Sequence, residues 1–423
     1  MSGFGSALPW AEPSWYSGRP SPYYNDSHRR LREAVRRWTE ENVSGNIEDW
    51  EAAGKIPDSV YQKCARDGLL LPLAFGSSIP KEFAACAIIG GIKAEQWDGF
   101  HDSALWDELV RGGAIASIFI GLTVGTPPLI RYGSSHLRGQ VLPGILSGEK
   151  KICLAITEPS GGSDVRNLTT TAEKTADGKY YIVNGEKKIS GNRKLIVTGG
   201  PGVTGISLLL IPRSEGIRTR PLSVTPGNLS ATTYISFEDV RVPVENLVGI
   251  EGSGFKYIMN NFNHERLWIV FQALRGSRIA IQDAMTWALK REAFGTTLIE
   301  QPVVRHKFGL MAKEIEALQA WTEQIIFELD NLSHDDGNRL LGGVTALLKV
   351  KAGMVAKLVA DECVKIMGGL GLTKTGQGAR IESFARATAS IVIPGGAEDV
   401  LIDLGVREAL KLTHMATGRQ PKV

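Results

Sequence analysis

Hydrophobic and polar positions follow two different periods along the chain, and the period changes twice. Residues 26–150 place apolar side chains at helical spacing, and Asp26 or Ser27 offers an N-cap to the first helix. From about 150 to 248, short runs rich in Ile, Val, Tyr and Thr alternate with turn residues, including a hairpin signal at 176–179. The first region is therefore predicted to be helical, with helices over 27–40 and 57–67, and the second to be a β module.

Helical periodicity returns after the β module. Helices are expected over 254–291, 302–331 and 340–367, followed by a Gly-punctuated loop at 374–380 and a last helix over 397–413. The order of helices, strands and helices lacks the βαβ alternation of a Rossmann fold. It predicts an α+β protein with an irregular N-terminal arm (1–25), a helical domain (26–150), a middle antiparallel β-barrel or sandwich domain (151–250) and a C-terminal four-helix bundle (251–423).

One apolar stretch, residues 112–130, approaches membrane-spanning length. It contains four glycines and the pair Pro127-Pro128, whereas a spanning helix needs about 20 predominantly apolar residues. We therefore expect a buried core helix that ends in a turn at the proline pair, and no membrane partner.

The net charge and the cysteine spacing argue against nucleic-acid binding, a zinc site and a disulfide framework. The formal net charge is only +3 and no basic block is concentrated, so a nucleic-acid partner is not indicated. The four cysteines, at 64, 86, 153 and 363, are too widely spaced for a zinc site or a disulfide framework and suit a reducing compartment. Mitochondrial, peroxisomal and secretory signals are not evident, so cytoplasm is the default expectation.

The segment 153–165, CLAITEPSGGSDV, carries the first chemical signal. Its glycines allow the backbone to approach a ligand closely, and their amides, together with the Ser163 hydroxyl, suit a pyrophosphate. The same residues also fit an ordinary Gly-Ser surface loop. The segment alone leaves both interpretations open.

Five ordered segments resemble the acyl-CoA dehydrogenase family. TEPSGGSD at 157–164 is similar to the T-E-P-x-A-G-S-D signature of that family. Matching segments follow in the family's order: GEKK at 185–188, FEDVRVPVENLVG at 237–249, LKREAFG at 289–295 and IMGGLG at 366–371. The resemblance covers about 26–414. It implies an acyl-CoA substrate, an FAD cofactor, a homo-oligomer that is usually a tetramer, and reoxidation by an electron-transfer flavoprotein or by oxygen.

The resemblance also implies which residues contact the ligands. The expected FAD contacts are Ile156, Thr157, Gly162, Ser163, Ser190, Arg291, Phe294, Lys365, Gly368, Gly369, Ala397 and Asp399. The expected substrate contacts are Ser163, Asn263, Arg266 and Gly396. In the family, Arg291 and the Gly368-Gly369 pair would reach a flavin of a neighbouring subunit. Taken without the family, Arg291 is a solvated helix residue, and the glycine pair simply ends a helix.

The chemistry needs a carboxylate that removes the α-proton of the thioester while the β-hydrogen leaves as hydride. Many family members use the Glu of a Y-E-G-T motif, but the matching residues here are Pro394-Gly395-Gly396-Ala397. The isovaleryl-CoA and long-chain branch instead carries its Glu on the first long helix after the β domain, in a context like L-E-R-L. This chain has His264-Glu265-Arg266-Leu267 there, so Glu265 is the predicted base.

Helical spacing supports Glu265 independently of the family. The apolar residues of its helix face recur at steps of three or four, at Ile258, Phe262, Ile269 and Ala273. A carboxylate in an apolar stripe needs a partner or a role, and desolvation is expected to raise its pKa. A Glu265 that only pairs with a basic residue is the structural alternative. Asp399 is the rival base, although acidic residues are also common in a first helical turn.

The resemblance implies that the backbone N–H of Gly395 still polarises the thioester carbonyl, because that contact needs no side chain. One segment departs from the family. A W-I-T segment normally follows G-E-K-K, whereas Lys188 is followed here by Ile189-Ser190-Gly191-Asn192-Arg193. Ser190 is then the nearest hydroxyl for the flavin ring. Two other functions stay open: a related flavin oxidase of acyl-CoA or nitroalkane type, and a non-catalytic member acting as a binding subunit.

Overall fold

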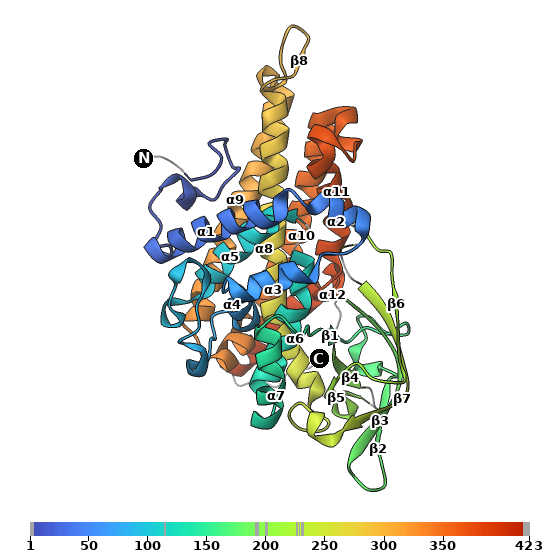
Figure 1. Ribbon diagram of the computed structural model, residues 1–423. Coiled ribbons are helices and arrows are strands. Elements are labelled where there is room, and N and C mark those ends of the chain that lie inside the picture. The colour runs from blue at the N-terminus through green and yellow to red at the C-terminus, as the bar shows by residue number, and fades with distance from the viewer. Residues whose placement is uncertain are drawn as a thin grey trace. The chain divides into compact units, whose positions relative to one another are not determined.

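The structure is a computed structural model that describes residues 4–113, 116–190, 194–198, 202–225, 227, 229 and 232–417, without the side chains of 116–118, 189–190 and 194–198. The chain forms two compact units (Figure 1). The first comprises Met1–Arg36, Gly99–Arg111 and Arg266–Val423, and the second comprises Arg37–Asp98 and Gly112–Glu265. Each unit thus combines segments that lie far apart in the sequence.

The helices of the N-terminal third follow the predicted order. They are α1 (Asp26–Thr39), α2 (Ile47–Ala53), α3 (Asp58–Arg66), α4 (Leu70–Phe75), α5 (Gly99–Arg111), α6 (Ala116–Tyr132) and α7 (Ser135–Leu146), with a π turn over Glu40–Ser44. The predictions over 27–40 and 57–67 are confirmed by α1 and α3. The shorter helices were not predicted individually.

Helix α6 corrects one prediction, because it does not end at Pro127-Pro128 but continues to Tyr132. Proline has no N–H, so Pro128 leaves the carbonyl of Val124 without its helical donor. The side chain of Asn261 supplies that donor, with Nδ2 at 2.9 Å from the Val124 oxygen. No helix in the described part of the chain is long and apolar enough to cross a bilayer.

The middle region folds into two sheets. One sheet has the order β1 (Leu154–Ala155), β4 (Lys194–Thr198), β5 (Ser207–Ile211), and the other β2 (Thr171–Lys174), β3 (Tyr180–Ser190), β7 (Thr232–Pro243), β6 (Ile217–Pro221). The predicted hairpin at 176–179 joins the antiparallel pair β2 and β3. The pairing of β1 with β4 is parallel, which differs from the wholly antiparallel expectation.

Both sheets contribute to one core, as in a sandwich. Its buried residues include Ala155 and Leu209 from the first sheet and Val183, Ile235 and Phe237 from the second. Strands β2 and β6 were not predicted as strands. Both lie at an edge of the four-stranded sheet and are mostly exposed, so they carry little of the apolar alternation that identifies a strand.

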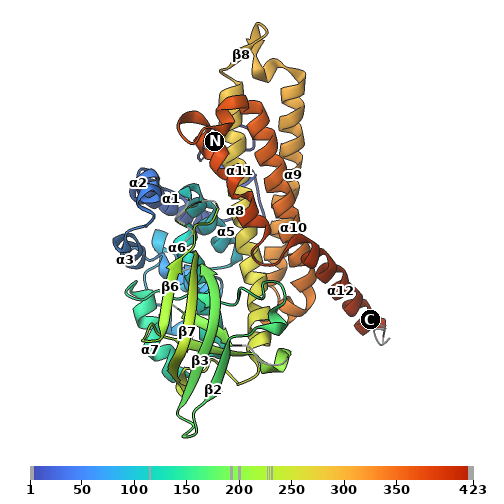
Figure 2. The ribbon, with the colours of Figure 1, turned by 90° about the vertical axis from the view of Figure 1, so that its right-hand side faces the viewer.

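Long helices dominate the C-terminal part: α8 (Gly254–Ala288), α9 (Pro302–Asp330), α10 (His334–Met367), α11 (Ala379–Val392) and α12 (Glu398–Thr417), with a two-stranded hairpin β8 (Glu292–Ala293), β9 (Thr296–Thr297) after α8. Within the first unit α10 packs against α9, α11 and α12 (Figure 2). Helix α11 was not predicted, and a loop was expected over its first two residues. This helix is rich in alanine and buries only Ile381 and Ile391, so its hydrophobic periodicity is weak.

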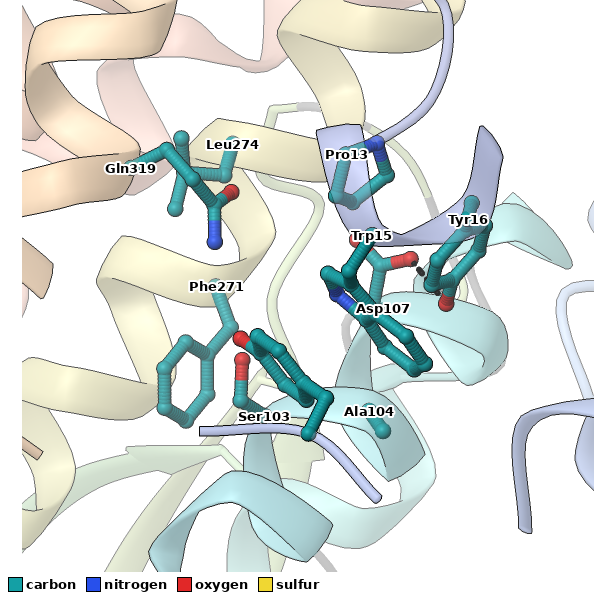
Figure 3. Close-up of a pocket in the computed structure, with 10 residues that line it drawn as sticks. Pro13, Trp15, Tyr16, Ser103, Ala104, Asp107, Phe271, Leu274 and Gln319 are labelled. Atoms are coloured by element: carbon teal, nitrogen blue, oxygen red, sulfur yellow. Dashed lines mark hydrogen bonds between the residues drawn. The ribbon is translucent and has the colours of Figure 1, made fainter. Parts of the chain in front are cut away.

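The N-terminal arm was predicted to be irregular, and within its described residues, 4–25, a 3-10 turn at Ser14–Ser17 is the only regular element. It is nevertheless a packed part of the first unit, with Trp15 and Tyr16 buried. Figure 3 shows these two side chains beside Asp107 of α5, across a small cavity from Phe271 of α8. The arm therefore belongs to the core of the first unit.

Candidate active site

The Gly-Ser segment follows β1 as an exposed turn of the second unit. Thr157, Gly162 and Ser163 are exposed and Ile156 is half-buried. A Cβ added to Gly162 would meet no atom within 4 Å, so a ligand can approach this backbone closely. The N–H of Lys188 donates to the Thr157 carbonyl at 2.8 Å, which ties the turn to β3.

A buried ion pair holds this turn from behind. Nζ of Lys187 lies 2.6 Å from a Glu158 carboxylate oxygen and 3.0 Å from the Ile156 carbonyl oxygen. The other donors to Glu158 are the N–H groups of Thr169 and Thr170 and the Thr169 hydroxyl, at 2.6 to 3.0 Å. The turn is therefore fixed on the side that faces the protein, and Gly162 stays exposed while Gly161 is buried.

The pKa values of both members of this ion pair are shifted strongly from their ordinary values. Burial raises the pKa of Glu158, but the hydrogen bonds from Lys187 and the two threonines outweigh burial and lower this pKa to about 2. Burial lowers the pKa of Lys187 to about 8, against the opposing effect of Glu158. Both residues belong to family-like segments, TEPSGGSD and GEKK, but their pairing across 29 positions was not predicted.

The segment expected to cover the flavin ring falls largely outside the described residues. Ser190 ends strand β3, but its side chain is not described, and the same holds for the side chains of 194–198. Residues 191–193 are outside the described part altogether. The role of Ser190 therefore stays a prediction.

Helix α8 carries the predicted base and two predicted substrate contacts. Asn263 and Arg266 are buried, and Glu265 is half-buried. The stripe predicted around Glu265 is mainly buried, because Ile258, Ile269 and Ala273 are at most 1% exposed and Phe262 is half-buried. The carboxylate of Glu265 thus lies on an apolar face of α8.

The turn between α11 and α12, which contains Gly395 and Gly396, lies against Arg266 and Ile269 of α8. Nε of Arg266 donates to the Gly395 carbonyl oxygen at 3.2 Å. Gly395 has φ of 70° and Gly396 φ of 114°, conformations that favour glycine, and a Cβ at Gly395 would come within 2.9 Å of Ile269 Cδ1. In this turn, Gly395 therefore brings a peptide group rather than a side chain toward α8.

The rival carboxylates begin α12. Asp399 is exposed, and Glu398 forms an ion pair with Lys357 at 3.1 Å. Both residues stand in the first turn of the helix, where acidic side chains interact favourably with the helix dipole. Ala397 directly precedes them and is half-buried.

The remaining predicted cofactor contacts are exposed positions of the first unit. Arg291 and Phe294 lie at the hairpin that follows α8, labelled β8 in Figure 1. The side chain of Phe294 is 96% exposed. Lys365 pairs with Asp361 and Glu362 near the end of α10. Gly368 and Gly369 follow that end and are exposed, with no atom within 4 Å of an added Cβ. Their roles as cofactor contacts stay predictions.

Known proteins match this chain along its length. Sequence models of the acyl-CoA dehydrogenase N-terminal, middle and C-terminal domains match residues 25–149, 153–240 and 252–410. The chain is 44% identical to the acyl-CoA dehydrogenase apdG of Emericella nidulans over 424 residues, 96% of each chain. It is 28% identical to the mitochondrial long-chain specific acyl-CoA dehydrogenase of Sus scrofa, over 91% of this chain and 87% of that one.

A solved structure gives the same picture. The structure of a probable acyl-CoA dehydrogenase from Mycobacterium abscessus superposes with a TM-score of 0.81 at 28% identity, covering 92% of this chain and all of that one. The three-part fold and the Gly-Ser turn define an acyl-CoA dehydrogenase fold. This chain belongs to the acyl-CoA dehydrogenase family.

Proposed function

We propose that this protein is an FAD-dependent acyl-CoA dehydrogenase that converts an acyl-CoA into a 2-enoyl-CoA, with Glu265 as the base. The main support is the hydrogen bond from Arg266 to the Gly395 carbonyl oxygen. It joins the helix that carries a half-buried carboxylate to the turn that carries glycine in place of the usual family base.

Glu265 takes the α-proton of the acyl thioester as a general base. The N–H of Gly395 donates to the thioester carbonyl oxygen and stabilises the negative charge that develops there. FAD, when bound, would supply the hydride acceptor for the β-hydrogen. Two electrons and one proton would then leave the substrate as that hydride, and the α-proton would stay on Glu265. Asn263, Arg266, Gly396 and Ser163 orient the substrate.

The exposed turn at 156–163 fits the pyrophosphate and ring side of FAD, because its backbone is open at Gly162 and Lys187 holds the Ile156 carbonyl from behind. Four further residues are proposed to contact FAD: Ser190, Lys365, Ala397 and Asp399. Arg291, Phe294, Gly368 and Gly369 serve the flavin of a neighbouring subunit, which requires a homo-oligomer, proposed to be a tetramer.

Helix α12 supports the oligomer. It exposes Val400 and Met415, and it also exposes Ile402, Val406 and Leu410, which follow one another at steps of four residues on one face. Such a face is usually covered by a partner surface. The reduced flavin is reoxidised by an electron-transfer flavoprotein or by oxygen. We place the enzyme in the cytoplasm, and comparing oxidation by each acceptor separates a dehydrogenase from an oxidase.

The test is the visible spectrum of the purified protein with FAD, followed by anaerobic titration with acyl-CoA thioesters of increasing length. Flavin bands that bleach on addition of substrate are expected for the wild type and for Asp399→Asn. Bleaching is expected to be lost in Glu265→Gln, which retains size and polarity. A colourless protein that takes up no FAD contradicts the proposal, and bleaching that survives in Glu265→Gln contradicts the assignment of the base.

A further inference from the structure

Lys349, in the middle of α10, is a fully buried lysine that no motif of the sequence singled out. Its Nζ donates to the carbonyl oxygens of Val392 and Gly396, the latter at 2.7 Å. Burying an ammonium group is costly unless it is paired or hydrogen-bonded. Its contacts therefore indicate a specific task.

Those two carbonyls stand at the two ends of one turn. Val392 is the last residue of α11, and its carbonyl is one of the four that a helix leaves without a helical donor. Gly396 lies just before α12, which begins at Glu398. A single ammonium group thus closes the turn from both sides.

A second cation holds the middle of the same turn, because Arg266 donates to the Gly395 carbonyl oxygen. In a trans peptide the N–H points opposite to the preceding carbonyl. Fixing the carbonyls of Gly395 and Gly396 on the side of the cations therefore turns the N–H groups of Gly396 and Ala397 away from them, and the Gly395 N–H lies in the segment that Lys349 holds at both ends through Val392 and Gly396. Among the described residues, neither Gly395 nor Gly396 donates a backbone hydrogen bond, so both N–H groups remain available to a ligand.

We propose that Lys349 is a positioning residue for the reaction: by holding the carbonyls of Val392 and Gly396 it sets the glycine turn so that its N–H groups meet the thioester carbonyl. This inference rests on the proposed function, in which Gly395 N–H polarises that carbonyl. Lys349 itself contacts neither substrate nor reacting atoms. Its effect is on the geometry of the donor, and a displacement of about 1 Å in such a site lowers a rate about 100-fold.

The experiment uses the FAD-loaded enzyme and an acyl-CoA analogue with sulfur in place of the β-carbon. This probe can lose its α-proton but has no β-hydrogen to give as hydride. Its enolate beside oxidised flavin gives a long-wavelength band, so a pH titration of that band measures the acidity of the bound α-proton. The variant Lys349→Met removes the ammonium group and keeps the side-chain length. Lys349→Gln keeps a polar group in the site.

Both variants are expected to raise the apparent pKa of the bound probe by about one unit or more, a tenfold or greater loss of acidity. They are expected to lower kcat by about 100-fold while KM stays near the wild-type value. Lys357→Met is the matched control, because Lys357 also lies on α10 and forms only a solvent-exposed ion pair, with Glu398 of α12. It is expected to change neither the apparent pKa of the probe nor kcat. The thermal midpoint of each protein stripped of FAD reports folding separately from chemistry.

Unchanged acidity of the probe in the folded Lys349 variants would overturn the inference, whatever happens to the thermal midpoint. Loss of FAD together with the band in both variants would also overturn it, because Lys349 would then serve the fold alone. A wild-type enzyme that neither forms the band nor bleaches with acyl-CoA would overturn the proposed function and this inference with it.

Discussion

Buried charges occur in both units, but they are arranged in opposite ways. In the first unit, three acidic and three basic side chains form one network: Glu12, Asp107, Glu108, Arg36, Arg111 and Arg275. In the second unit, Glu158 and Lys187 form a single pair that is completed by threonine and backbone groups. The network joins separate segments of the chain, whereas the pair fixes one turn.

The network is balanced charge for charge, and most members have more than one partner. Glu12 of the arm receives hydrogen bonds from Arg111 and Arg275 at 2.8 to 2.9 Å and lies 3.3 Å from Arg36. Burial raises the pKa of Glu12, but the three arginines outweigh burial and lower it. The arm thus brings one carboxylate to a site where three guanidinium groups meet, and this explains why an irregular segment packs so tightly.

The two arrangements predict different losses when a charge is removed. In a network, removing one member leaves one buried charge in excess and weakens the binding of every partner that the member contacted. In the pair, the remaining group keeps the neutral donors or acceptors that surround it. Removing one partner of a buried pair typically costs about 3–5 kcal/mol of stability, so the network is expected to lie at the upper end of that range.

The largest effect is expected for Arg275→Met. Arg275 is fully buried and bonds to Glu12, Asp107 and the Ala11 carbonyl oxygen. Its removal leaves two carboxylates buried, so the free energy of unfolding is expected to fall by about 5 kcal/mol. Denaturant unfolding measures the change. Arg339→Met, which breaks an exposed pair with Asp336, is the control with an expected loss below about 1 kcal/mol. Equal losses in the two variants would contradict the network interpretation.

A smaller loss, about 3 kcal/mol, is expected for Glu158→Gln. The amide keeps the shape of the carboxylate but leaves the Lys187 ammonium with the Ile156 carbonyl and no opposite charge at hydrogen-bonding distance. The loss should depend on pH, because the folded-state pKa of Glu158 is about 2 against an ordinary value of 4.5. A lowered pKa contributes stability above pH 4.5 that is lost as the pH falls through 2.

Unfolding of the wild type and of Glu158→Gln between pH 7 and pH 2 checks this dependence. The difference between them should be constant above about pH 5 and shrink below pH 4.5. A difference that stays constant down to pH 2 would mean that Glu158 has an ordinary pKa in the folded state.

Long periodic elements were predictable from the sequence, and short or exposed ones were not. Helices α8, α9 and α10 and strand β7 carry their own periodicity over 12 or more residues. The edge strands β2 and β6 are too exposed to show alternation. The continuation of α6 past its prolines depends on Asn261, 137 positions away in the chain. Such long-range partners leave no local pattern.

The candidate site shows the same division. Residues inside motifs, such as Gly162 and Arg291, were named in advance because the motif itself carries the information. The contacts that only the structure reveals lie between motifs or outside any motif. The Glu158–Lys187 pair joins two motifs, and Lys349 lies in none. A lysine among the apolar positions of a long helix was the available signal for Lys349.

Lys187→Met is expected to lose less than Glu158→Gln, about 2 kcal/mol, although it breaks the same pair. Glu158 would keep the N–H groups of Thr169 and Thr170 and the Thr169 hydroxyl, so its charge remains hydrogen-bonded. Denaturant unfolding at pH 7 ranks the two variants. The reverse order would show that the charge of Lys187, rather than the donors around Glu158, dominates this site.

The smallest effect is expected for Thr169→Val, which removes the hydroxyl that donates to Glu158 at 2.8 Å but leaves the backbone N–H in place. Hydrogen bonds to charged groups contribute about 1.5–3 kcal/mol, but Thr169 is exposed and water can replace part of its hydroxyl, so a loss of about 1 kcal/mol is expected. Thr219→Val, whose hydroxyl only accepts from the exposed Arg213, is the matched control and should change stability by less. A Thr169→Val loss as large as that of Glu158→Gln would mean that the second unit, like the first, depends on a network in which every member is required.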